Sequence, residues 1–105
     1  MIPLGMREDE FELAFAEFQR FGPRRRISIQ TRWQEILPEL LPAQIPGLLA
    51  ICNEIQSFAT AIAGRVVDGG LSEDLAAKQI SGRFPFLTAA QLRRTLSQAC
   101  YFAAK

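Results

Sequence analysis

Few side chains in this 105-residue chain are suited to catalysis, because it has no histidine and only two cysteines. Cys52 and Cys100 are far apart and form no CxxC pair, so they provide no zinc or haem spacing. Neither the glycine patterns that bind nucleotides nor the GxSxG nucleophile motif occurs in the sequence. We therefore expect no enzymatic activity, no metal and no cofactor, and we expect both cysteines to be small buried apolar residues.

The densest charge is a group of five arginines within thirteen residues: Arg20, Arg24, Arg25, Arg26 and Arg32. Guanidinium groups bind phosphate and carboxylate in a bidentate manner, so the group predicts a contact with an anion or an acidic partner. Alternatively, these arginines pair with residues 1–19, which carry five acids against Arg7 alone. Acidic and basic segments alternate along the whole chain, and this alternation suits either internal pairing or self-association.

A second polar group lies on the last predicted helix, in a segment with five bases and no acid over residues 76–105. A turn of about 100° per residue places four side chains away from the apolar face of that helix: Arg94, Gln98, Tyr101 and Lys105. A basic helix that presents glutamine and tyrosine can lie in a DNA groove. An ordinary pair of helices with a basic outer face is the alternative.

The segment 71–104 is predicted to be a pair of short helices. It contains Ser-Glu-Asp-Leu-Ala from Ser72, then Phe84-Pro85-x-Leu87-Thr88, then Leu92-Arg93. This pattern resembles the helix-turn-helix half of small bacterial antitoxin-like proteins, over about a third of the chain, and the resemblance implies DNA recognition. The segment departs from the motif between Ser81 and Leu87, because the usual turn has three or four residues.

The first three regular elements of the chain are predicted to be helices, since apolar residues recur at helical spacing. The first should span 8–21 and end at the Gly-Pro pair that follows. The second should begin after Ser28, which can cap it, and end or kink near Leu37, because Pro38 cannot donate a backbone hydrogen bond. The third should run from Pro46 or Gly47 to about residue 67 and carry the broadest apolar stripe.

Two further helices are predicted in the C-terminal part. Ser72 can cap the first of them, and Ser81-Gly82 should end it. Thr88 and Gln91 have the spacing of a capping box that would open the second.

We predict an all-α fold, a compact antiparallel bundle of four to five helices in a single domain over residues 1–105, with 1–7 as a flexible tail. Trp33 should lie in the core, where its ring N–H needs an acceptor. The full predicted core is Phe11, Phe15, Phe18, Trp33, Leu37, Ile51, Cys52, Ile55, Phe58, Ile62, Leu75, Ile80, Leu92, Leu96 and Ala99.

Apolar residues make up 49% of the chain, an excess that predicts an apolar surface for a partner. Three outward apolar side chains are candidate anchors: Leu13, Phe86 and Phe102. The favoured function is a non-enzymatic protein–protein interaction or self-associating module, such as a homo-oligomer. The alternative is nucleic-acid binding through Arg24–Arg26 and the basic C-terminal helix. With no signal-peptide pattern and no long apolar run, we expect a cytoplasmic protein with no membrane contact.

Overall fold

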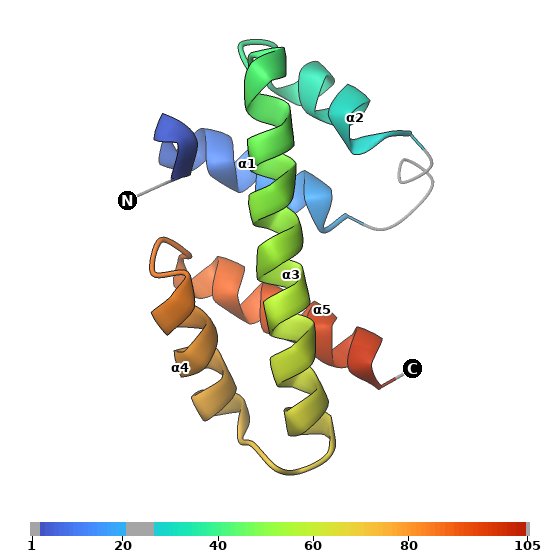
Figure 1. The fold of residues 1–105 in the computed structure, drawn as a ribbon, viewed down its shortest axis with the longest axis vertical. Helices are drawn as coiled ribbons and strands as arrows, with labels where there is room; N and C mark the ends of the chain where they lie inside the picture. Colours follow the sequence, from blue (N-terminus) through green and yellow to red (C-terminus); the bar gives the residue numbers. More distant parts are fainter. Residues whose placement is uncertain (1–2, 21–26, 105) are drawn as a thin grey trace. The chain divides into compact units, whose positions relative to one another are not determined.

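The computed structural model describes residues 3–20 and 27–104, and all the regular elements within these ranges are helical (Figure 1). The predicted all-α fold class is confirmed. Five α-helices occur in these ranges: α1 (Glu8–Phe18), α2 (Ile29–Ile36), α3 (Ile45–Val67), α4 (Glu73–Arg83) and α5 (Ala89–Ala103). The chain forms two compact units, Ile2–Cys52 and Asn53–Lys105, and α3 contributes residues to both.

The first helix of the N-terminal unit, α1, is shorter than its apolar pattern predicts. It ends at Phe18, because the chain tightens there and the N–H of Arg20 bonds to the carbonyl of Glu17. Phe11 and Phe15, one turn apart, are fully buried and their rings stack with centroids 5.5 Å apart. Residue 21, the predicted last residue of this helix, lies outside the described residues.

The boundaries of α2 follow the prediction closely. The Ser28 hydroxyl accepts a hydrogen bond from the backbone N–H of Thr31 at 3.2 Å, which caps the helix. The helix ends at Ile36, and Leu37 before Pro38 has a non-helical conformation. Trp33, near the middle of α2, is fully buried.

Residues 3–7, which the sequence predicts to be a flexible tail, contain a 3-10 turn at Pro3–Gly5 followed by a buried Met6. Leu4 adopts the left-handed region at φ 63°. Its Cδ2 atom lies 3.2 Å from where a Cβ atom on Gly47 would stand, so a larger residue at position 47 would require the Leu4 side chain to shift slightly. Leu4 therefore packs onto the first turn of α3.

The long helix α3 follows a 3-10 turn at Pro42–Gln44. Its buried residues recur at helical spacing: Ile45, Leu48, Cys52, Ile55, Ala59, Ile62 and Ala63. The segment Pro42–Val67 is long and apolar enough to cross a membrane, with a mean hydropathy of 1.2 over its best window. This is weak support for a membrane span, because a helix packed in a protein core passes the same test, and Glu54 and Arg65 lie within it.

The helices α3 and α4 of the C-terminal unit are joined by a tight turn. Gly69 has φ 83°, and the N–H of Gly70 bonds to the carbonyl of Arg65, as in a glycine-ended helix. Arg83 pairs with Glu54 of α3 at 3.0 Å, and its guanidinium carbon lies 5.1 Å from the centre of the Phe58 ring. These contacts hold the last turn of α4, which continues past the predicted stop at Ser81-Gly82 and ends at Arg83.

Five predicted core residues are less buried than expected. Leu75 is 50% exposed because α4 buries Ala76 and Ile80, and Leu75 lies about 100° around the helix from Ala76. The other four are half-buried at the edges of their helix faces: Phe18, Ile51, Phe58 and Leu92.

Candidate protein-binding site

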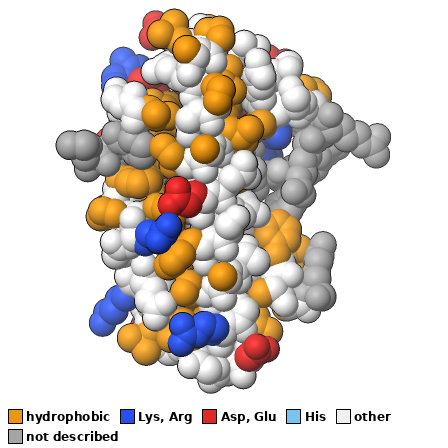
Figure 2. Space-filling model, in the orientation of Figure 1, with side chains coloured by type: hydrophobic (Ala, Val, Ile, Leu, Met, Phe, Trp, Pro, Cys, Tyr) orange, Lys and Arg blue, Asp and Glu red, His pale blue; other side chains and the backbone are white. Residues whose placement is uncertain are grey.

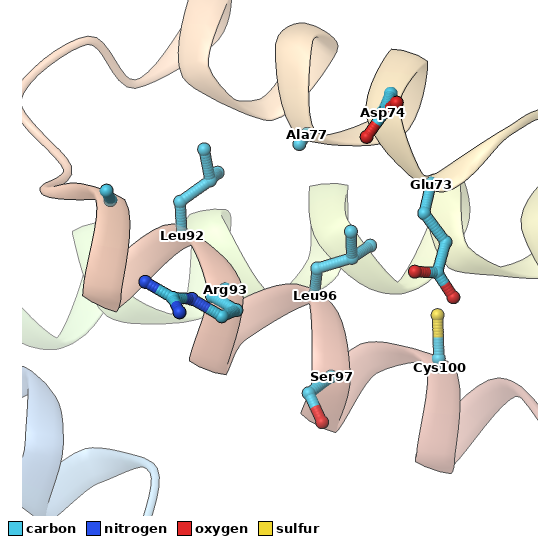
Figure 3. Close-up of a pocket in the computed structure, with 9 residues that line it drawn as sticks. Glu73, Asp74, Ala77, Leu92, Arg93, Leu96, Ser97 and Cys100 are labelled. Carbon is cyan, nitrogen blue, oxygen red and sulfur yellow. The ribbon is translucent and has the colours of Figure 1, made fainter.

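A pocket of about 470 Å³ lies between one face of α4 and one face of α5 in the C-terminal unit (Figure 3). Glu73, Asp74 and Ala77 line it from the first turns of α4. The α5 residues that line it recur at helical spacing and so share one face: Ala89, Leu92, Arg93, Leu96, Ser97 and Cys100. The pocket is therefore a groove between two helices, and all its residues belong to one compact unit.

Both helices that form the pocket begin at well-capped ends. The Ser72 hydroxyl accepts a hydrogen bond from the N–H of Leu75 at 3.2 Å. The Thr88 hydroxyl accepts from the N–H of Gln91 at 3.1 Å, and the Gln91 side chain accepts from the N–H of Thr88 at 2.8 Å. The reciprocal pair is the predicted capping box, and it fixes where α5 starts.

The rotation of α5 exposes part of its apolar side. Gln91 and Thr95 are buried on the inward face with Leu96 and Ala99. Gln91 can be buried because its amide oxygen is bonded within the cap. As a result, Leu92 and Cys100, expected on the buried face, are only partly covered and line the pocket instead.

Charges of opposite sign lie at the two ends of the pocket. Figure 3 shows Glu73 beside Cys100 at one end, with Asp74 next to it on α4, and Arg93 beside Leu92 at the other end. All three charged side chains are exposed, and within residues 3–20 and 27–104 none of them forms an ion pair. The pocket thus has an apolar floor with a negative and a positive end.

The pocket contains one thiol, and it is not activated. Burial, and then the negative charge of Glu73, raise the pKa of the Cys100 thiol. Figure 3 shows the Glu73 carboxylate and the Cys100 sulfur pointing toward one another. A protonated thiol is a poor nucleophile, so this arrangement favours binding over covalent chemistry. Among the described residues, no three His, Cys, Asp or Glu side chains gather to hold a metal ion.

The described members of the predicted arginine group contact the acidic first helix. Arg32 is buried, donates to the carbonyl of Glu17 at 3.1 Å, and has its Nη1 atom 3.9 Å from the Glu17 carboxylate. Arg20 pairs with the same carboxylate at 3.4 Å. Arg24, Arg25 and Arg26 lie outside the described residues. The Arg32 guanidinium donates to the carbonyls of Ile27 and Glu17, an arrangement that corresponds to the alternative in which these arginines pair with the acidic first segment.

The predicted nucleic-acid face is only partly exposed. Tyr101 is exposed, whereas Arg94 and Gln98 are half-buried, and all three side chains have interaction partners within the protein. Lys105 lies outside the described residues. The link between α4 and α5, predicted to span 81–87, is the shorter segment 84–88 because α4 continues to Arg83.

The three predicted apolar anchors differ in exposure. Leu13 is 51% exposed and lines a smaller pocket of about 260 Å³ in the N-terminal unit. Phe86 is half-buried, and its ring packs edge-on against Phe84 at 6.1 Å between centroids. Phe102 is half-buried beside Tyr101. Figure 2 shows hydrophobic side chains in several separate places on the face in view, interspersed with charged ones.

Glu73, Asp74 and Arg93 were not identified as site residues from the sequence. The available signal was the helical spacing of Leu92, Leu96 and Cys100 on the last predicted helix. That spacing predicts a buried face for these three residues rather than a site. No family model, curated protein or solved structure matches this chain. The functional interpretation therefore depends on the geometry of this pocket.

Proposed function

We propose that this chain is a non-enzymatic protein-interaction module that binds its partner at the α4–α5 pocket. The observation that supports the proposal is the half-covered apolar stripe of α5, where Leu92 and Cys100 line an open groove. Covering such a stripe with apolar side chains from another chain removes it from water, which is the main driving force for protein association. Helices commonly bind in grooves of this kind.

The side chains in the pocket favour binding rather than catalysis. The raised pKa of Cys100 keeps its thiol protonated near neutral pH. Glu73 and Asp74 are exposed, so solvent screens their charges. Both described arginines of the predicted group already contact Glu17 of α1: Arg20 pairs with its carboxylate, and the buried Arg32 donates to its carbonyl. These placements favour a protein partner over nucleic acid.

The experiment compares capture of proteins by the tagged chain and by two leucine variants. Leu92→Asp places a charge in the pocket, whereas Leu75→Asp makes the same change at an exposed position of α4 outside it. The tagged chains are incubated with a lysate of the cells that produce this protein. We expect the partner captured by the wild-type chain to be captured by Leu75→Asp but not by Leu92→Asp. Circular dichroism must first show equal helix content. Equal capture by Leu92→Asp and the wild type would contradict the proposal.

A further inference from the structure

We infer that the occupant of the α4–α5 pocket is a second copy of this chain, bound with its α5 antiparallel to the first. The inference rests on the proposed function, since it names the partner of the same site. It is based on the order of charges along the pocket, which is negative at the Cys100 end and positive at the Leu92 end.

An antiparallel pair of α5 helices brings these ends together. In a two-fold symmetric contact centred on Leu96, Leu92 of one copy lies opposite Cys100 of the other. Arg93 lies about 4.5 Å along the helix axis from Leu96, and Cys100 lies about 6 Å away on the other side. Two-fold symmetry therefore places the Arg93 side chain of each copy at the Cys100 end of the other, where Glu73 and Asp74 stand.

A parallel arrangement of the two α5 helices is less favourable. A parallel pair would place Arg93 beside Arg93 and Glu73 beside Glu73, and like charges across an interface oppose binding. The antiparallel pair makes the same opposite-charge contact twice and covers both apolar stripes at once. The small side chains of Ala77, Ala89 and Ser97 at the pocket allow two helices to approach closely.

Charge reversal tests the arrangement. In the antiparallel dimer, Arg93→Glu places an acid beside Glu73 of the other copy. Glu73→Arg places a base beside Arg93 of the other copy. We expect each single variant to raise the dimer dissociation constant about tenfold, because two contacts change in every dimer. The double variant Glu73→Arg/Arg93→Glu restores both contacts with their signs exchanged, so its dissociation constant should return close to the wild-type value. Sedimentation equilibrium over a wide concentration range gives these constants.

Two variants control for charge and for folding. Lys78→Glu makes the same charge change as Arg93→Glu on an exposed part of α4 outside the pocket. Glu8→Arg matches Glu73→Arg, because each glutamate is the first residue of its helix, after caps at Arg7 and Ser72. Both controls should dimerise like the wild type.

A cross-link gives an independent measurement of the antiparallel contact. In a Cys100→Ser background, chains carrying Glu73→Cys are mixed with chains carrying Arg93→Cys and then oxidised. The mixed disulfide should form faster than either disulfide between identical chains.

The outcomes separate this inference from the proposed function. A wild-type chain that stays monomeric at every concentration overturns the inference, and so does a double variant as weak as the singles. If capture of other proteins is still lost with Leu92→Asp, the proposed function stands while the second copy is excluded as the partner. If capture is also insensitive to Leu92→Asp, both are wrong.

Discussion

The ring nitrogen of Trp33 on α2 donates a hydrogen bond to the backbone carbonyl oxygen of Ala14 on α1, at 2.9 Å. Both residues are buried, so this bond joins the two helices within the apolar interior of the N-terminal unit. It supplies the acceptor that the sequence analysis required for a buried tryptophan. A buried polar group that loses its partner destabilises the fold, which makes this bond a clear target for mutation.

Trp33→Phe should lower the free energy of unfolding by about 1–3 kcal/mol, because it removes the donor and part of the buried ring. Urea unfolding followed by circular dichroism measures the change. Gln34→Ala, at the exposed neighbouring position, should change stability by less than about 0.5 kcal/mol. A Trp33→Phe protein as stable as the wild type would show that the hydrogen bond does not matter.

Arg32→Met should destabilise the chain by about 3 kcal/mol, because the buried carboxylate of Glu17 then keeps, among the described residues, only the exposed Arg20 as its charged partner. The double variant Arg32→Met/Glu17→Gln no longer buries this charge. We therefore expect it to be more stable than Arg32→Met alone, as measured by urea unfolding. A double variant whose loss equals the sum of the two single losses would contradict charge coupling between the residues.

Alkaline pH should destabilise the protein through Cys52. Burial raises the pKa of this thiol from 9.0 to about 12. Between these values the unfolded chain releases the thiol proton while the folded chain keeps it, so the free energy of unfolding falls as pH rises from about 9 toward 12. Cys52→Ala should be less stable at neutral pH but should show a smaller fall between pH 8 and pH 10.5. If the free energy of unfolding falls equally in Cys52→Ala and in the wild type over this pH range, the prediction is wrong.

The two thiols should react differently with a thiol reagent. Cys52 is fully buried and should stay unlabelled in the folded protein, whereas Cys100 is partly exposed. Glu73→Gln removes one of the two causes that raise the pKa of Cys100, so labelling of Cys100 in dilute protein at pH 8 should become faster. Lys78→Gln, which changes a charge elsewhere on α4, serves as the comparison. An unchanged labelling rate in Glu73→Gln would show that the Glu73 carboxylate does not influence the Cys100 thiol.

Arg83 should contribute more to stability than its partner Glu54. Both side chains of this ion pair are about half exposed, so the pair itself adds at most about 1 kcal/mol. The guanidinium also lies over the rings of Phe58 and Phe84, at 5.1 and 5.7 Å. Arg83→Ala should therefore lower the unfolding midpoint in urea more than Glu54→Ala. Equal shifts of the unfolding midpoint in Arg83→Ala and Glu54→Ala would show that Arg83 stabilises the fold only through the ion pair.

The sequence predicted those features of the fold that depend on local chemistry. Caps at Ser28, Ser72 and Thr88 were identified because a hydroxyl before a helix satisfies its free N–H groups. The stop before Pro38 followed from the missing proline donor. The extension of α4 past Gly82 was missed, since the contacts of Arg83 with α3 outweigh the low helix propensity of glycine.

The candidate site was harder to predict than the fold. Hydrophobic spacing correctly identified Leu92, Leu96 and Cys100 as one stripe of a helix. It could not show that Gln91 and Thr95 would lie on the inward face of α5, so that part of the stripe faces an open pocket. Likewise, Glu73 and Arg93 are neighbours of one groove only after α4 and α5 have packed, and nothing in their spacing along the chain indicates this.

The helix α3 passes without interruption from one compact unit into the other at Cys52 and Asn53. A break at that point would separate carbonyl groups from the N–H groups four residues later, with no cap on either side. A rearranged gene that encodes only one unit would therefore produce a chain in which α3 is frayed at its cut end. We expect neither unit to keep a complete α3 when it is expressed alone.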